Sequence, residues 1–326
     1  MDKTAIAVLI TIFVYLAAMV VIGIMCSKKN KSADDFYLGG RKLGPLVTAM
    51  SAEASDMSSW LLMGLPGVAY LTGIAEAFWT ALGLAIGTWV NWLVVSKRIR
   101  RYSQKIDAIT IPDFFSKRYK DTKNLLSFVA ALVILVFFIP YTASGFAACG
   151  KLFKSLFNVD YHQAMIICAV IIVVYTTLGG FIAASTTDFI QSIIMTIALV
   201  VVLGFGTAKA GGFGEVVDNA KNLAGYLSLK DVFSPVTGTS ASYGGVLAIV
   251  STLAWGLGYF GMPHILLRFM AARDEKKLTL SRRVATVWVV ISMGLSIVIG
   301  MVGLGMTKAG VLPSLQGANS ETVIVE

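Results

Sequence analysis

Long apolar stretches separated by short polar segments dominate the chain. Stretches of about 18 residues or more are long enough to cross a bilayer as helices. Eight such spans are predicted: Thr4–Cys26, Pro45–Tyr70, Thr72–Ser96, Asn124–Cys149, Tyr161–Leu178, Phe181–Thr207, Gly244–Phe269 and Val284–Thr307. Only Gly179 and Gly180 separate the fifth span from the sixth. One fused helix there would be about 68 Å long, more than twice the thickness of a bilayer core, so we expect a turn at the glycines.

The composition supports the same class of protein. Of 326 residues, 56% are hydrophobic and only 14% are charged, and the mean hydropathy is +0.78. Soluble domains carry about 25% charged residues, so a soluble globule, a disordered chain and a coiled coil are excluded. We expect an all-α polytopic membrane protein whose surroundings are mainly the lipid bilayer. The cysteines Cys26, Cys149 and Cys168 lack metal-ligand spacing and are interpreted as packing residues.

The positive charges indicate an orientation in the membrane. With Arg268 counted in the segment that follows the seventh span, alternate segments carry 20 and 7 of the 27 Lys and Arg residues, and none is then expected inside a span. The richer side should be cytoplasmic, which places the amino terminus outside. The net charge of +9 then reflects topology and attraction to anionic lipid. A nucleic-acid partner is not expected.

Four acidic residues fall within the apolar stretches: Glu53, Asp56, Glu76 and Asp188. A carboxylate at mid-membrane costs at least about 2.5–3.5 kcal/mol, so such residues face a bundle interior or a wet cavity unless they lie near the interface. We expect the interface for Glu76 and the interior for Asp56. Both interpretations stay open for Glu53 and Asp188.

Two of the predicted spans contain helix-weakening sequences. The second holds the small and polar run Ser51–Trp60, followed by a further weak point at Gly64–Gly67, and the seventh holds three glycines and a proline in Trp255–Pro263. Non-helical backbone at membrane depth survives only beside a cavity or within protein. Glycines that merely permit close helix packing are the alternative.

The interrupted spans are five apart, which is the offset of two inverted five-helix repeats. In such transporters, substrate and coupling ion bind at the paired interruptions near the midplane. We therefore predict one transmembrane domain, 1–326, comprising a leading helix (4–26), a first repeat (45–207) and the first two helices of a second repeat (244–307).

The sequence carries no constellation of catalytic residues. The histidines His162 and His264 have no second ligand at metal-binding spacing and are interpreted as ordinary hydrogen-bonded side chains. A Walker loop is also missing. An enzyme or an ATP-driven pump is therefore not expected, nor is a cofactor other than a coupling ion.

Three segments resemble the sodium:solute symporter family, and within it the bacterial transporters of proline. They are Phe36–Pro45 (FYLGGRKLGP), Ser55–Gly67 (SDMSSWLLMGLPG) and Trp255–His264 (WGLGYFGMPH), and Tyr141–Gly145 and His264–Met270 extend the likeness. It runs in colinear order from about residue 5 to residue 320. The resemblance implies a LeuT-like inverted-repeat fold with an extra leading helix. It also implies uptake of L-proline, or a similar small solute, with Na⁺ across the bacterial plasma membrane.

The resemblance also implies site residues. In the family, Na⁺ takes backbone carbonyls that correspond to Ala54 and Met57, and Asp56 and Ser58 match positions important for Na⁺ binding or coupling. The residues implied for the solute are Tyr141, Trp255, Tyr259 and Pro263. Aromatic walls suit an apolar pyrrolidine ring. Arg41 matches a coupling or gating position at the cytoplasmic mouth, although a positive-inside charge explains it nearly as well.

Some residues depart from the pattern of the family. Glu53 and Ser59 stand where glycine is expected, and Met262 stands where glutamine is expected, inside the solute segment. A symporter of another small organic solute, or a membrane sensor without transport, therefore remains an alternative. The family also has more spans than the eight found here. We expect this chain to be a fragment with an incomplete second repeat, from which the remaining Na⁺ ligands are missing.

Overall fold

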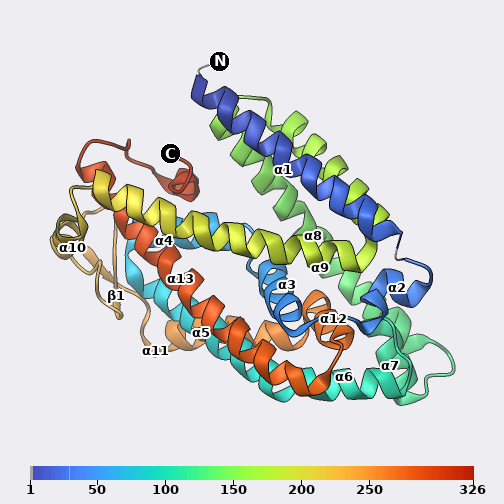
Figure 1. The fold of residues 1–326 in the computed structure, drawn as a ribbon. Coiled ribbons are helices and arrows are strands. Elements are labelled where there is room, and N and C mark those ends of the chain that lie inside the picture. The colour runs from blue at the N-terminus through green and yellow to red at the C-terminus, as the bar shows by residue number, and fades with distance from the viewer. Residues whose placement is uncertain (1–2, 29) are drawn as a thin grey trace. The chain divides into compact units, whose positions relative to one another are not determined.

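The computed structural model describes residues 3–28 and 30–326, and helices make up most of it (Figure 1). In chain order the α-helices are α1 (Lys3–Ser27), α2 (Ala33–Leu38), α3 (Pro45–Met57), α4 (Leu65–Thr72), α5 (Ile74–Val94), α6 (Ser96–Lys105), α7 (Ile111–Tyr119), α8 (Leu125–Phe157), α9 (Tyr161–Lys209), α10 (Phe213–Lys221), α11 (Gly245–Leu253), α12 (Pro263–Ala271) and α13 (Leu278–Lys308).

Shorter elements connect these helices. They are the π-helical turn η2 (Trp60–Gly64) and the 3₁₀ turns η1 (Gly39–Arg41), η3 (Ala254–Phe260), η4 (Glu275–Lys277) and η5 (Gly317–Thr322). The strands β1 (Asp231–Phe233) and β2 (Ser240–Ser242) pair antiparallel, with Asp231 opposite Ser242.

The chain forms two compact parts that alternate along the sequence. The first part consists of Met1–Asp56, Trp92–Gln191 and Gly261–Val284, and the second consists of Met57–Asn91, Ser192–Phe260 and Ala285–Glu326. Both interrupted spans pass from one part to the other, at Asp56/Met57 and at Phe260/Gly261. Each part has its own set of internal contacts.

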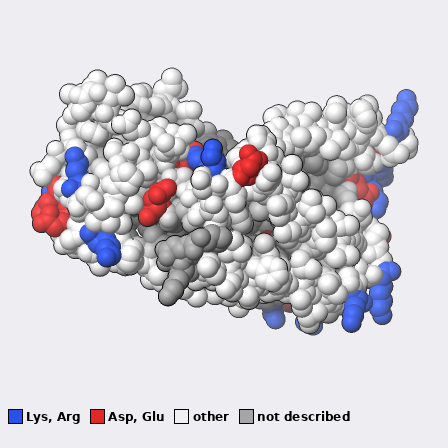
Figure 2. All heavy atoms as spheres, turned by 90° about the horizontal axis from the view of Figure 1, so that it is seen from above, with Lys and Arg blue, Asp and Glu red and all other residues white. Residues whose placement is uncertain are grey.

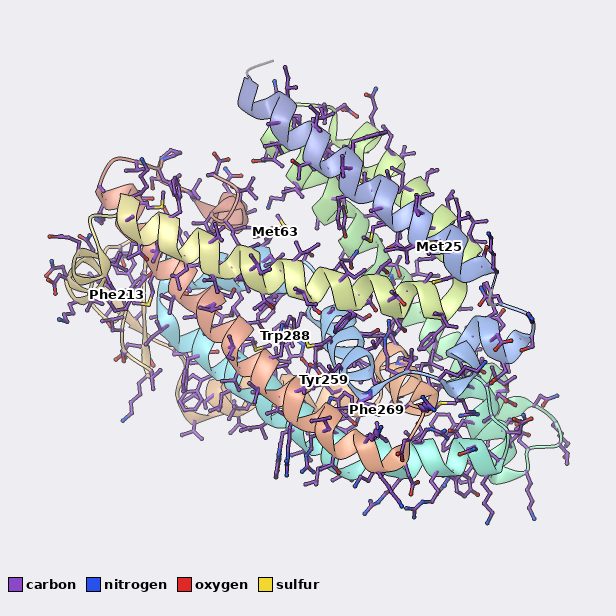
Figure 3. The ribbon with its side chains drawn as sticks, viewed as in Figure 1. Met25, Met63, Phe213, Tyr259, Phe269 and Trp288 are labelled. Carbon is purple, nitrogen blue, oxygen red and sulfur yellow. The ribbon has the colours of Figure 1, made fainter. Side chains whose placement is uncertain are left out.

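In the first part, the buried helix α12 packs against α6 and contacts Trp92 and the segment before α3. Phe269, labelled in Figure 3, is fully buried and packs edge-on against Trp92, with ring centroids 4.4 Å apart. The Arg100 guanidinium donates to the carbonyl oxygen of Ala272, just beyond α12. Leu43 and Ala272 form an isolated parallel bridge. These contacts join the carboxyl end of α12 to α6 and to the segment before α3.

In the second part, the core lies between α13 and the segments at its carboxyl end. One buried cluster consists of Ala210, Val216, Val302, Met306 and Leu312. Tyr70, Leu315 and Val323 form a second buried cluster. The Tyr70 hydroxyl lies 3.0 Å from the Thr307 hydroxyl and accepts from the Leu315 backbone N–H at 3.1 Å. A tyrosine with a polar tip therefore holds the loop after α13 against α4.

Within residues 3–28 and 30–326, five helices are long and apolar enough to cross a membrane, and α11–η3 with α12 forms a further, broken candidate. In α8 none of the most apolar window is buried. The Met25 side chain extends outward from α1 in Figure 3. Charged side chains are few on the side of the molecule that Figure 2 shows. Exposed apolar surface of this extent is typical of a membrane protein, in which lipid replaces water.

The predicted turn between the fifth and sixth spans is confirmed. The segment Tyr161–Lys209 is a helix of 49 residues, but Gly180 within it has φ 60° and ψ −156°. A residue with a side chain rarely adopts that conformation, whereas glycine does so without a steric penalty. The backbone therefore breaks at Gly180 into two stretches, each short enough for a span, and the break is visible as a bend in α9 (Figure 1).

The interruption of the second span is also confirmed, although one detail is wrong. Helix α3 ends at Met57, Ser58 has φ 47°, and the N–H groups of Leu62 and Met63 both donate to the Ser59 carbonyl. The second weak point expected at Gly64–Gly67 is instead helical, because Pro66 occupies the first turn of α4, where its missing N–H costs nothing.

The seventh span is interrupted as well. Helix α11 gives way to the 3₁₀ turn η3, and Met262 is extended, with φ −72° and ψ 112°, before Pro263 begins α12. Glycine and proline weaken a helix for different reasons, one entropic and one through the lost N–H. Their combination in Trp255–Pro263 accounts for the break.

Candidate ion and solute site

The nine residues predicted for the site fall into the two parts of the chain. Ala54, Asp56, Tyr141, Pro263 and Arg41 belong to the first part. Met57, Ser58, Trp255 and Tyr259 belong to the second.

An aromatic cluster joins α8 to the start of α12 in the first part. The rings of Tyr141 and His264 are stacked, with centroids 5.7 Å apart at 19°, and Phe138 lies 5.4 Å from each of them. The Tyr141 hydroxyl donates to the carbonyl oxygen of Ser55 at 3.1 Å. Pro263 is the first residue of α12. Tyr141 is therefore tied to the end of α3 and to the residue that follows Pro263.

Asp56 lies at the same place. Its side chain is only 4% exposed, and its Oδ1 is 4.0 Å from Nε2 of His264. The expected interior position of Asp56 is confirmed. Ala54 is half-buried on the same turn of α3.

His264 differs from its sequence-based interpretation. Neither ring nitrogen has a hydrogen-bond partner among the residues that the structure describes. The expectation of an ordinary hydrogen-bonded histidine is therefore wrong at this position. The imidazole is held by ring stacking, and a buried polar group of this kind is unusual in proteins.

A buried ion pair lies next to this cluster. The pairing of its two residues was not predicted from the sequence. Arg268 Nη2 is 2.8 Å from Asp188 Oδ2, with side chains only 9% and 17% exposed. The hydroxyls of Ser51 and Ser55 donate to the same carboxylate oxygen at 2.7 and 2.9 Å. The guanidinium in turn donates to both serine hydroxyls. Residues four apart lie on one face of a helix, so α3 presents both serines to the pair.

This pair corrects the expectation that no Lys or Arg lies within a span. Arg268 falls inside the predicted span Gly244–Phe269 and is buried on α12. A cation in an apolar run normally pairs with an acid, and that signal was present in the sequence. The sequence did not indicate the partner, because Asp188 is 80 residues away.

The other two acids of the apolar stretches, Glu53 and Glu76, differ in burial. Glu53 is buried and accepts a hydrogen bond from the Trp92 indole N–H at 2.9 Å. Glu76 is exposed in the first turn of α5, as expected for a residue near an interface. An acid at a helix amino terminus also interacts favourably with the helix dipole.

Arg41 binds backbone carbonyl groups. Its guanidinium donates to Ala108 at 2.7 Å and to Met270 at 3.1 Å, and to the Ser103 hydroxyl at 3.2 Å. Burial lowers the pKa of this guanidinium from its ordinary value. The contacts connect η1 to the ends of α6 and α12. Its role in gating stays a prediction.

In the second part, η3 lies directly against α5. The Tyr259 side chain is buried, and its carbonyl oxygen accepts from Asn91 Nδ2 at 2.9 Å (Tyr259 is labelled in Figure 3). Trp255 contacts Trp60 of η2, with ring centroids 4.9 Å apart. Met57 is buried, and Ser58 is exposed at the break.

Glycines bring the backbones of η3 and α5 into contact. A Cβ built on Gly256 would overlap the carbonyl oxygen of Gly83 and crowd Gly87. The alternative of close helix packing therefore holds for Gly256, although the helix is also broken there. The two explanations are compatible because a 3₁₀ turn can itself pack closely.

Substitution of Gly256 by alanine should destabilise the protein. The added methyl would meet backbone, which cannot rotate away, and overpacking of this kind costs about 1–3 kcal/mol. Unfolding of the purified protein in detergent, followed by tryptophan fluorescence, measures the change. Gly294→Ala on α13 is the matched control, because a Cβ there meets nothing within 4 Å. Equal stability of the two variants would contradict the close contact.

Comparison with known proteins gives concordant matches. The profile of the sodium:solute symporter family matches residues 36–325. The osmoregulated proline transporter OpuE of Bacillus subtilis is 43% identical over 92% of this chain and 59% of its own length. The sodium/proline symporter of Salmonella typhimurium is 41% identical over 98% of this chain and 62% of its own length. The chain thus spans about three-fifths of the length of these relatives.

A solved structure shows the fold. The substrate-bound, outward-open state of a Na⁺-coupled sialic acid symporter matches 99% of this chain and 65% of its own chain, with a TM-score of 0.79 and 18% identity. The expected all-α, LeuT-like fold is therefore confirmed.

Proposed function

Because this chain belongs to the sodium:solute symporter family, we propose that its protein imports L-proline together with Na⁺ across the bacterial plasma membrane. The observation that carries the proposal is the identity of 40–43% to several proline transporters, over 88–98% of this chain. The interrupted helices support it, because transporters of this kind bind substrate and ion where helices are discontinuous.

The proposed site uses the ends of the interrupted helices. Na⁺ would take the carbonyl oxygens of Ala54 and Met57, with Asp56 supplying negative charge and Ser58 lying at the break. The residues that the resemblance implies for the solute are Tyr141, Trp255, Tyr259 and Pro263. Aromatic side chains suit the apolar ring of proline, and open backbone groups suit its carboxylate and ammonium.

Two further features belong to the same proposal. The repeats 45–207 and 244–307 would have inverted topology, with 4–26 as an additional leading helix. The amino terminus would lie outside, as the distribution of Lys and Arg indicates.

Uptake by the full-length protein in proteoliposomes tests this function. An inward Na⁺ gradient should drive accumulation of radiolabelled L-proline, and an equal K⁺ gradient should not. Vesicles with empty bilayers provide the background. Proline entry that is indifferent to Na⁺, or absent with correctly inserted protein, would contradict the proposal. The latter result would favour a membrane sensor on the same scaffold.

Met262 favours a second candidate, a Na⁺-coupled symporter of another small organic solute. It is the extended residue immediately before α12, and it stands where the resemblance leads us to expect glutamine. Replacing an amide by a thioether removes hydrogen-bonding groups and adds a flexible apolar surface. Competition of proline uptake by a panel of amino acids and carboxylates distinguishes the two candidates. A better competitor than proline would identify the preferred solute.

A further inference from the structure

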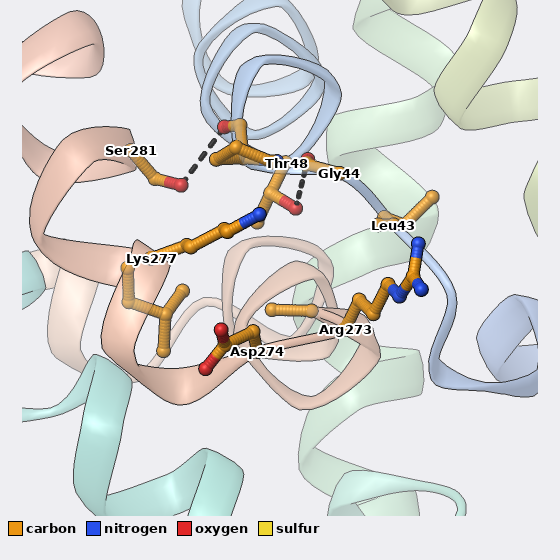
Figure 4. Close-up of a pocket in the computed structure, with 10 residues that line it drawn as sticks. Leu43, Gly44, Thr48, Arg273, Asp274, Lys277 and Ser281 are labelled. Atoms are coloured by element: carbon orange, nitrogen blue, oxygen red, sulfur yellow. Dashed lines mark hydrogen bonds between the residues drawn. The ribbon is translucent and has the colours of Figure 1, made fainter.

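A pocket of about 270 Å³ lies at the start of α3, and none of the proposed solute residues lines it (Figure 4). Two segments of the first part form it, Leu43–Thr48 and Ala272–Ser281. They are joined by hydrogen bonds from Arg273 N to Leu43 O, at 2.9 Å, and from Ser281 Oγ to Pro45 O, at 2.8 Å. The pocket therefore has walls that are fixed to each other.

The charges that line the pocket are two bases and one acid. Lys277 extends its ammonium group into the pocket, whereas Arg273 lies along Leu43 (Figure 4). Neither base has an ion-pair partner within 4.0 Å in the part of the chain that the structure describes. Asp274 instead caps η4, where its carboxylate accepts from Lys276 N at 2.9 Å. The lining thus carries a net charge of +1, and neither of these two bases forms an ion pair with a described residue.

The uncharged polar groups of the pocket are already satisfied. Thr48 is fully buried, and its hydroxyl donates to Gly44 O at 2.8 Å. Ser281 is also fully buried and donates to Pro45 O. Figure 4 draws both bonds. A ligand would consequently be recognised by the two cations of the lining, and these select an anion.

The position of the pocket indicates the source of such an anion. It lies between the end of α12, which completes the broken candidate span Gly245–Phe260 with Pro263–Ala271, and the start of the candidate span Glu275–Lys308. The ends of such segments reach the level of lipid headgroups. Basic pockets between helices at this level bind phosphate-bearing headgroups.

We propose that the pocket of Arg273 and Lys277 binds a phosphate anion, supplied by an anionic lipid headgroup or by free phosphate. Lys277 contacts the phosphate as a point charge, and Arg273 closes over it from the side of Leu43. Binding here would hold together the segment before α3 and the connection from α12 to α13.

Lipid titration of the delipidated full-length protein, followed by native mass spectrometry, tests the site. Loss of a direct contact between a lysine and an anionic headgroup weakens binding by about fivefold. Lys277→Gln should therefore bind phosphatidylglycerol about fivefold more weakly than the unmodified protein. Lys276→Gln is the matched control, since Lys276 carries the same charge and is exposed as Lys277 is, but does not line the pocket. Its affinity should change less than twofold.

Inorganic phosphate and diacylglycerol separate the possible sources. If Lys277→Gln weakens binding of phosphatidylglycerol but phosphate alone does not bind, the ligand is a lipid headgroup. If phosphate binds with the same dependence on Lys277, it is a soluble anion. Equal losses in Lys276→Gln and Lys277→Gln, or equal binding of uncharged diacylglycerol, would overturn the proposal. Thermal unfolding of both variants confirms that they fold alike.

Discussion

Replacing Arg268 by methionine should lower the free energy of unfolding by about 3–5 kcal/mol, the largest effect we expect from a single substitution. Removing one partner of a buried ion pair leaves the other charge uncompensated in a medium of low dielectric constant. Here the remaining carboxylate of Asp188 would keep only the hydrogen bonds from Ser51 and Ser55. Unfolding of the full-length protein in detergent measures the loss.

A double-mutant cycle and a surface control make this result specific. Asp188→Asn combined with Arg268→Met should cost less than the sum of the single substitutions, because no charge is then left unpaired. Arg101→Met removes an arginine from an exposed ion pair with Glu275, in which the arginine side chain is 73% exposed. We expect little change in stability for that variant. Strictly additive losses would show that Asp188 and Arg268 do not act as a pair.

Asp56→Asn should raise the Na⁺ concentration needed for half-maximal proline uptake by about tenfold or more, with unchanged insertion. The carboxylate is nearly buried beside His264, and an anionic charge in such surroundings attracts a cation far more strongly than it does in water. A tenfold change corresponds to about 1.4 kcal/mol. Uptake in proteoliposomes over a series of Na⁺ concentrations measures it.

Glu76→Gln is the control for this prediction. Glu76 also lies in an apolar stretch, but it is exposed in the first turn of α5. Its loss should leave the Na⁺ dependence unchanged. An Asp56→Asn protein with normal Na⁺ dependence would reduce Asp56 to a structural residue.

The membrane helices and their interruptions could be predicted because both depend on local sequence. Length and hydropathy predict a span directly. The break at Gly180 follows from the thickness of a bilayer, and the break at Ser58 follows from a run of small polar residues. Short elements such as α2, α7 and the β1–β2 hairpin were not predicted, since their polar sequences carry little periodic signal.

The buried polar contacts could not be predicted to the same extent. Each joins segments that are distant in sequence, as with Asp188 and Arg268, or Glu53 and Trp92. Periodicity places a residue on a helix, but it does not specify which helix lies opposite. The ring nitrogens of His264, which have no hydrogen-bond partner among the described residues, show the same limit, because the sequence does not indicate that Phe138 and Tyr141 pack against this ring.

We propose that Na⁺ and solute bind at the same pair of interrupted helices and stabilise each other's binding. Linkage is reciprocal, so a single equilibrium measurement suffices. The dissociation constant of L-proline from the full-length protein, measured by equilibrium dialysis in NaCl and in choline chloride, should be at least about tenfold lower with Na⁺, within the usual range of coupling energies. Equal dissociation constants in the two salts would contradict the account.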